Sequence, residues 1–95
     1  MPYVRLSIAK PRKGDEERLL EVMRRLNDLA AQQDGCVDSW VLKPHDGSGE
    51  IARIAVYKDE SSAEAAANSQ SVMSLRSELH LLSEPGHMER AFFSV

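Results

Sequence analysis

The chain has 95 residues, a formal net charge of −3 and a single cysteine, Cys36. This length predicts one domain, spanning residues 1–95, with a modest hydrophobic core. Interspersed charges exclude the basic footprint of a nucleic-acid-binding protein, and one thiol excludes an internal disulfide or a multi-thiolate metal site. No apolar run approaches the roughly 20 residues that a membrane helix needs. No basic segment leads into an apolar signal region, so we expect a cytoplasmic protein.

The first predicted element is a strand over residues 3–9. Its side chains alternate between a mixed set and an aliphatic set, which are Tyr3, Arg5 and Ser7 against Val4, Leu6 and Ile8. A helix should follow from Glu16, where apolar residues recur at steps of three and four. Asp15 is predicted to cap this helix with its carboxylate, and Gly35 lies where a helix end favours positive φ.

Residues 36–58 are predicted to form a β-hairpin. A period of two places Val37, Ser39, Val41, Ile51, Arg53, Ala55 and Tyr57 on one face, and Trp40, Leu42, Ala52, Ile54 and Val56 on the other. Pro44 ends the first strand, and the glycines of residues 46–49 permit the turn. Neither face is cleanly polar, so we expect both to be covered.

A second helix and a fourth strand complete the chain. Asp59 is predicted to cap a helix that starts in the alanine-rich segment 61–67. Residues 68–71 compete for backbone hydrogen bonds, so we expect a kinked or two-piece helix that resumes at Val72. Pro85 and Gly86 end it, and residues 87–95 alternate as a strand.

The order βαββαβ predicts an α+β, ferredoxin-like fold, with two helices on one face of a four-stranded antiparallel sheet. Strands one and three should lie in the centre of the sheet. We expect the aliphatic sets of these strands to face the helices, which are Val4, Leu6, Ile8, Ala52, Ile54 and Val56. The open face would then carry Arg5, Ser7, Arg53 and Arg90 with the apolar residues Tyr3, Val41, Ile51, Tyr57, Met88 and Phe92. A second copy of the chain is the simplest cover for such a patch.

Several local features together resemble the antibiotic biosynthesis monooxygenase family of dimeric α/β-barrel proteins. These are Gly35 before a strand, the turn Asp46-Gly47-Ser48-Gly49-Glu50, the strand end Val56-Tyr57-Lys58, the helix start Asp59-Glu60-Ser61-Ser62-Ala63, and Asn68-Ser69 before an amphipathic stretch. The resemblance covers nearly the whole chain. It implies an obligate homodimer in which two protomers pack sheet to sheet, and a cleft between the sheet and helices of each.

The resemblance also implies a range of activities, because the family includes cofactor-independent oxygenases of quinols and polycyclic phenols as well as haem-degrading enzymes. Quinol-oxidising members carry a histidine at the place that Ala66 occupies here. The asparagine, tryptophan and histidine of haem-degrading members correspond to Ser7, Ala66 and Arg76. Haem degradation by that route is therefore not expected, whereas oxygenation remains open because the family's catalytic residues vary.

The candidate catalytic residues are Tyr57, which can donate a hydrogen bond to a phenolate, and His80, which can act as a general base near neutral pH. Alternatively, Tyr57 is a strand-end residue with a solvated hydroxyl, and His80 lies on the flank of a helix without a catalytic role. Trp40 can stack on an aromatic ligand, or it can simply contribute buried area. His45 and His87 are interpreted as turn and strand-entrance residues. Three scattered histidines show no metal-type spacing, so we expect neither a metal nor a flavin.

The remaining candidates are three arginines that strand parity places on one sheet face: Arg5, Arg53 and Arg90. They can bind a small ligand, or they can form interprotomer ion pairs with Asp38 or Glu89.

The sequence leaves two functions open for the protein. One is a cofactor-independent monooxygenase of small electron-rich aromatics such as quinols. The other is a non-catalytic dimer that binds a small ligand or serves a structural role.

Overall fold

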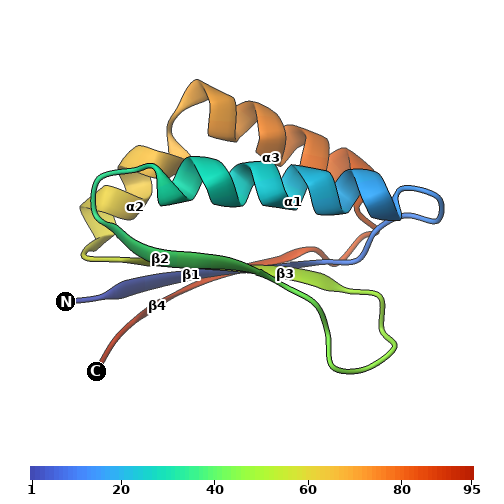
Figure 1. The fold of residues 1–95 in the computed structure, drawn as a ribbon, viewed down its shortest axis with the longest axis horizontal. Helices are drawn as coiled ribbons and strands as arrows, with labels where there is room; N and C mark the ends of the chain where they lie inside the picture. Colours follow the sequence, from blue (N-terminus) through green and yellow to red (C-terminus); the bar gives the residue numbers. More distant parts are fainter.

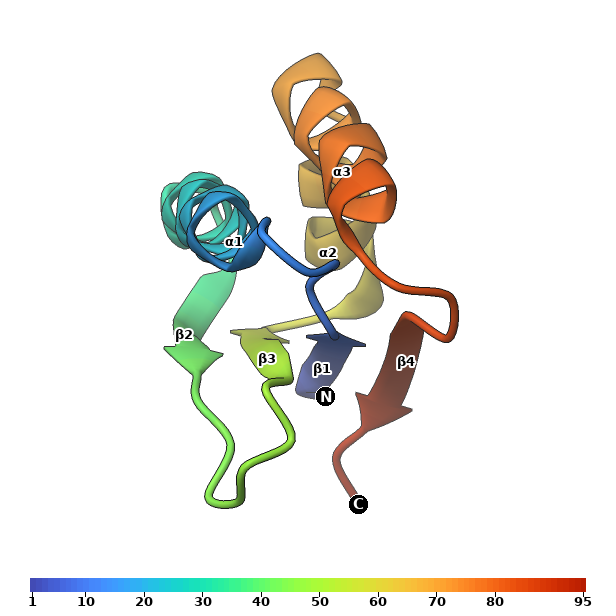
Figure 2. The same cartoon turned by 90° about the vertical axis from the view of Figure 1, so that its right-hand side faces the viewer.

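The computed structural model describes all residues, Met1–Val95, and has two layers, with three helices on one face of a four-stranded antiparallel sheet (Figure 1). In chain order the elements are β1 (Tyr3–Ala9), α1 (Glu16–Ala31), β2 (Cys36–Leu42), β3 (Ile51–Tyr57), α2 (Glu60–Ala67), α3 (Gln70–Leu82) and β4 (Met88–Phe93). The strand order β2-β3-β1-β4 places β1 and β3 in the centre (Figure 2). The predicted ferredoxin-like architecture is therefore confirmed. No helix combines the length and apolarity needed to span a membrane.

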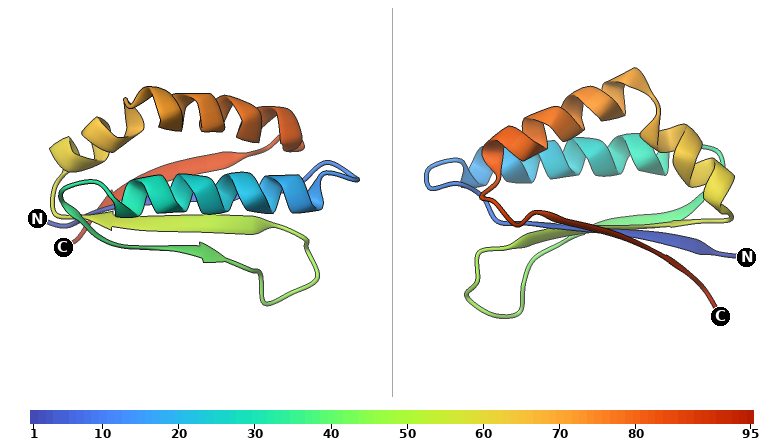
Figure 3. Two further views of the ribbon diagram at one scale, coloured as in Figure 1. Left: turned by 45° about the horizontal axis from the view of Figure 1, so that its top comes forward. Right: turned by 180° about the vertical axis from the view of Figure 1, so that it is seen from behind.

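The second helix is divided in two, as the sequence predicts, and α2 and α3 meet at an angle (Figure 3). Asp59 caps α2 by accepting a hydrogen bond from the Ser62 amide at 2.8 Å. Ser69 caps α3 by accepting one from the Val72 amide at 3.3 Å. Because α3 has its own N-terminal cap at Ser69, the helix can restart there, and the chain can change direction at Asn68.

The sequence predicts the glycine after the C-terminus of α1 correctly, but not the cap at its N-terminus. The expected side-chain cap by Asp15 is wrong: its carboxylate makes no capping bond, and Glu16 instead accepts from the Gly14 amide at 3.2 Å. Gly35 has φ +87°, as predicted, and a Cβ atom there would collide with the Ser62 Oγ and lie 2.7 Å from the Ser62 Cβ. Glycine is therefore required both by the backbone conformation and by the close approach of α2.

The alternation within each strand is correct, but the assignment of the faces is reversed. The helices cover Tyr3, Arg5, Ser7 and Ala9 of β1 and Ile51, Arg53, Ala55 and Tyr57 of β3, and all of these except the arginines are at most 9% exposed. The expectation that Val4, Leu6, Ile8, Ala52, Ile54 and Val56 face the helices is therefore wrong, since they form the open face and are half-buried in one chain. Periodicity fixes which residues share a face, whereas it does not say which face the helices cover.

The open face is more apolar than expected. Its edge strands add Trp40 and Leu42 from β2 and Met88 and Phe92 from β4, because these residues pair with the half-buried aliphatic residues of β3 and β1. Trp40, Leu42 and Phe92 remain 46%, 40% and 44% exposed. Tyr3, Val41, Ile51 and Tyr57 do not belong to this patch, contrary to the prediction. Tyr3, Ile51 and Tyr57 are buried beneath the helices, and Val41 packs against the core on that same side.

The core beneath the helices consists of two separate clusters. The larger one joins α1 and α3 to the sheet through nine buried residues, which are Ala9, Leu19, Val22, Met23, Leu26, Ile51, Val72, Leu79 and Leu82. The smaller one joins α2 to the opposite end of β1 and β3 through Tyr3, Ala55, Tyr57, Ala63 and Ala66. Members of both clusters line one cavity, so the space between them is where the packing is incomplete.

Candidate functional site

The cavity between the two core clusters has a volume of about 270 Å³ and is open to solvent. Its floor is the helix-covered face of β1, β3 and β4, and its walls come from α1, α2 and α3. The lining residues are Tyr3, Arg5, Leu6, Ser7, Leu26, Ala30, Arg53, Tyr57, Ala63, Ala66, Ala67, Val72, Arg76, Glu89, Arg90 and Ala91. A cavity between a sheet and its covering helices, apolar with a few convergent polar groups, is the usual form of a small-molecule site.

The size of the cavity follows from the composition of α2. Its wall is made of three alanines, Ala63, Ala66 and Ala67, which leave space that a larger side chain would fill. Ser7, Ala66 and Arg76 line this same cavity.

Two arginines on the floor are the main source of charge. Arg5 pairs in register with Ala55, and Arg53 pairs with Ser7, so the two arginines are diagonal neighbours on one face of the sheet. Diagonal residues of antiparallel strands lie roughly 7–8 Å apart, which allows two long side chains to reach a common group. The Arg5 guanidinium also lies 5.7 Å from the centre of the Tyr3 ring.

Neither arginine is fully satisfied within the chain. The Nε atom of Arg5 and the Nε and Nη1 atoms of Arg53 are buried and have no hydrogen-bond partner. Neither residue forms a salt bridge: Glu89, the carboxylate of the cavity, pairs with Arg76 instead. Burial lowers the pKa of Arg53, yet an arginine remains charged at neutral pH. The cavity therefore holds positive charge with free N–H donors.

Tyr57 closes β3 beside these arginines and is 3% exposed. Burial raises the pKa of its hydroxyl, while the neighbouring Arg53 guanidinium opposes that rise. The hydroxyl is accordingly neutral at pH 7 and available as a hydrogen-bond donor to an anionic oxygen. Tyr57 lies on the helix-covered face and not on the open face, contrary to the prediction.

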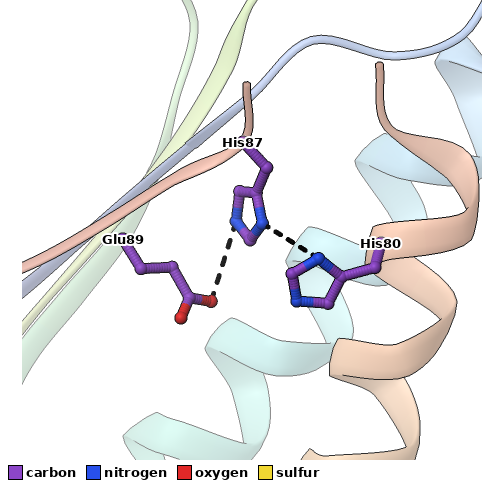
Figure 4. Close-up of side chains that lie close together, drawn as sticks. All are labelled: His80, His87 and Glu89. Atoms are coloured by element: carbon purple, nitrogen blue, oxygen red, sulfur yellow. Dashed lines mark hydrogen bonds and ion pairs between the residues drawn. The ribbon is translucent and has the colours of Figure 1, made fainter. Parts of the chain in front are cut away.

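A chain of hydrogen bonds leads from the cavity floor to solvent. The hydroxyl of Ser7, which lines the cavity, lies 3.0 Å from Nε2 of His87. The Nδ1 atom of His87 lies 3.3 Å from Nδ1 of His80 at the end of α3, and His80 is exposed (Figure 4). When His87 carries its proton on Nδ1, Ser7 can donate to Nε2 and His87 can donate to His80. The three groups then connect the cavity to bulk water for proton transfer.

His87 has the neutral state that this chain of hydrogen bonds requires. Its side chain is 7% exposed, and Glu89 Oε1 lies 3.7 Å from its Nε2 atom. Burial lowers the pKa of His87, with Glu89 opposing the shift and His80 and Arg76 adding to it. His87 is therefore neutral near pH 7 and able to accept a proton, and Glu89 would stabilise the imidazolium that results.

Three potential metal ligands also meet here, although their spacing in the sequence gave no sign of it. One ligand atom each from His80, His87 and Glu89 lies within 4.8 Å of the others (Figure 4). A divalent cation would compete with Arg76 for the Glu89 carboxylate, and it would lie near the uncompensated charge of Arg53.

The structure separates the other predicted site residues. Trp40 lies on the open face and does not line the cavity. Arg90 borders the cavity. The expectation that it shares a face with Arg5 and Arg53 is nevertheless wrong, because Arg90 pairs with Leu6 and its guanidinium lies 5.1 Å from the centre of the Phe92 ring. His80 does not line the cavity, and its connection to it runs through His87 and Ser7.

Sequence reasoning missed Ser7, His87 and Glu89 as functional candidates. The pairing of β1 with β4 places Ser7 opposite Glu89. It also brings Ser7 into contact with His87, 80 positions further along the chain, and no local sequence pattern predicts that contact. The sequence does contain one indication, because the alternation within β1 and β4 places the polar residues Ser7 and Glu89 on the same face of the sheet. This pattern points to a site only when it is known that the helices cover this face.

The sequence model of the family described as Antibiotic biosynthesis monooxygenase matches residues 2–76. No curated protein matches the sequence.

The chain is also similar in structure to several solved proteins at low sequence identity. One is the Rv0793 protein of Mycobacterium tuberculosis, at 15% identity and TM-score 0.91, covering 100% of this chain and 96% of the other. Another is SnoaB of Streptomyces nogalater, described as a cofactor-independent oxygenase, at 19% identity and TM-score 0.84, covering 99% and 93%. A third is a conserved protein of Methanosarcina mazei, at 12% identity and TM-score 0.88, covering 97% and 91%. These similarities show a shared fold.

Proposed function

Because this chain belongs to the antibiotic biosynthesis monooxygenase family, we propose that it is a cofactor-independent monooxygenase of a small, electron-rich aromatic compound such as a quinol. The single observation that carries the proposal is the cavity, in which buried N–H donors of Arg53 and the neutral hydroxyl of Tyr57 line one space with the Ser7 hydroxyl. The description of SnoaB as a cofactor-independent oxygenase supports the reaction type.

The first step in this proposal is deprotonation of a substrate hydroxyl. Ser7 accepts the substrate proton and passes its own to Nε2 of His87, whose Nδ1 proton can move on to His80 and solvent. The phenolate or enolate that forms is held by Arg53 and Tyr57. Donors fixed at the site of developing charge, away from water, are worth more than the same donors in bulk solvent.

The second step is reaction with dioxygen. The electron-rich anion gives one electron to O₂, and the radical pair combines to form a carbon–oxygen bond. The peroxide anion that forms takes back one proton through the His80–His87–Ser7 chain. The resulting substrate hydroperoxide then loses water as its O–O bond breaks and the proton on the same carbon leaves. One oxygen atom enters the product as a carbonyl and the other leaves as water, so the substrate supplies all the electrons and the protein supplies position and charge.

The open face completes the proposal. We infer that two copies pack sheet to sheet through the apolar residues of this face, since obligate interfaces commonly bury more than about 2,000 Å² in total. Apolar area removed from water contributes roughly 25 cal/mol per Å². Trp40, Arg90 and Phe92 would lie in that interface, where the Arg90 guanidinium could pair with Asp38 of the second copy. The protein would act in the cytoplasm as this homodimer.

Oxygen uptake tests the proposal. An oxygen electrode should record consumption when the protein is given a panel of hydroquinones and polyphenols, with a chelator present. Tyr57→Phe and His80→Ala should each lower turnover by on the order of ten- to a thousand-fold, the range for one positioned donor or base. Without consumption for any substrate of the panel, or with full rates in both variants, the non-catalytic ligand-binding function would replace this one.

A further inference from the structure

The charge inside the cavity is not balanced by the protein. Four arginines line the cavity, which are Arg5, Arg53, Arg76 and Arg90, with one carboxylate, Glu89, and that carboxylate is paired with Arg76. A buried ion without a partner is costly, and proteins normally pair or hydrogen-bond such groups. The unpaired Nε and Nη1 atoms of Arg53 are therefore an open position for an anion from outside the chain.

A second copy of this chain cannot supply the missing anion through the open face. Ion pairs between protomers are an alternative use of the arginines, and Arg90 lies on the face where such pairs can form. Arg5 and Arg53, however, lie on the helix-covered side of the sheet, and a partner packed on the open face would be separated from them by the sheet itself. A ligand in the cavity is left as the source of the anion.

We propose that the ligand of this cavity carries a carboxylate, which binds between Arg5 and Arg53, on an aromatic ring that packs against the alanines of α2. A planar carboxylate matches the donor geometry of a guanidinium, and two diagonal arginines can hold its two oxygens. Tyr57 adds a neutral donor to the same oxygens. As the substrate class of the same site, this inference rests on the proposed function, but the binding can be measured without any oxygen chemistry.

The volume limits the size of the ligand. A closed apolar cavity of about 150 Å³ accommodates benzene. A volume of about 270 Å³ therefore accommodates one substituted ring, and a polycyclic ligand would extend through the open side into solvent. The three alanine methyl groups of α2, with Leu26 and Val72, provide the apolar wall for the ring. The preferred ligand is therefore a one-ring aromatic acid, and a hydroxyl group on that ring would make it a substrate.

Calorimetric titration of the intact protein with four probes tests this inference. Benzoate and 4-hydroxybenzoate carry the carboxylate, phenol lacks it, and benzylamine reverses its charge. We expect the two acids to bind at least tenfold more tightly than phenol, and benzylamine not to bind. Chemical-shift changes at the amides of Ala63, Ala66 and Ala67 should place the bound acid in the cavity.

Two variants and one control decide the role of the arginines. Arg53→Met and Arg5→Met should each weaken benzoate binding by about ten- to a hundredfold, the range for losing one charge-assisted hydrogen bond. Arg24→Met, on the exposed side of α1, should bind as the unaltered protein does. Equal affinity for benzoate and phenol, or unchanged benzoate binding in both cavity variants, would overturn the inference.

The two proposals fail separately. Acid binding that depends on Arg53, with no oxygen uptake from any hydroxylated probe, would support the carboxylate site and contradict the monooxygenase function. Oxygen uptake with a hydroquinone that lacks a carboxylate, at a rate that no aromatic acid inhibits, would support the function and contradict the carboxylate site.

Discussion

Replacing Arg53 should make the empty protein more stable, which is the opposite of what most core substitutions do. The guanidinium is buried, its Nε and Nη1 atoms lack partners, and no salt bridge compensates its charge. Arg53→Met removes the charge and keeps an unbranched chain of similar reach, so the cost of burying the ion disappears while apolar packing is retained. Glu89 and Tyr57 already offset part of that cost, because both interact favourably with the charge of Arg53.

The expected gain is about 1–3 kcal/mol in the free energy of unfolding, below the several kcal/mol that an isolated buried ion costs. For a domain of this size, each kcal/mol raises the melting temperature by roughly 4–8 °C. Urea denaturation followed by circular dichroism, at one fixed protein concentration, measures the free energy of unfolding of each variant. The exposed control Arg24→Met should change the free energy by less than about 0.5 kcal/mol. A loss of stability in Arg53→Met beyond that of the control would show that Arg53 has an internal partner, and the anion site would lose its basis.

The other predictions concern the open face, the histidine pair and the cavity wall. Ile54→Asp should prevent stable dimers, and sedimentation velocity should show monomer or unfolded chain; an undisturbed dimer would place the interface elsewhere. Because the pKa of His87 is lowered, the unfolded chain binds a proton that the folded chain does not, so the free energy of unfolding should fall as the pH drops below about 6.5. His87→Gln should flatten that slope in urea titrations at several pH values, whereas an unchanged slope would assign it to another group. Ala67→Leu should fill the cavity and weaken benzoate binding at least tenfold by calorimetry, and normal binding would mean that the ring lies away from α2.

The sequence predicted the fold well because each element has its own signal. Alternation in residues 3–9 and 51–57 gave strands with the observed bounds, and the break after Asn68 gave a divided helix. The faces were reversed for a physical reason. Arginine rarely lies beneath helices, so the sequence predicts the aliphatic residues of β1 and β3 there. In the structure these aliphatic residues lie on the open face, and Arg5 and Arg53 lie beneath the helices because they border a cavity.

The candidate site was predicted only in part. Tyr57, Arg5 and Arg53 were named from the sequence and do line one cavity. The contact between Ser7 and His87 depends on β4 returning beside β1, and the contact between His87 and His80 depends on where α3 ends. Such contacts are properties of the tertiary structure, so no spacing within the chain can reveal them.

The central claim, a cofactor-independent monooxygenase reaction in this cavity, is tested most directly with isotopically labelled O₂. A hydroquinone or hydroxybenzoate substrate that the protein consumes would be incubated with the chelator-treated protein and labelled O₂, and the product analysed by mass spectrometry. We expect one labelled oxygen atom in the product and one in water, with product formation strongly reduced in Arg53→Met and retained in Arg24→Met. A product without label, or equal labelling in both variants, would contradict the account.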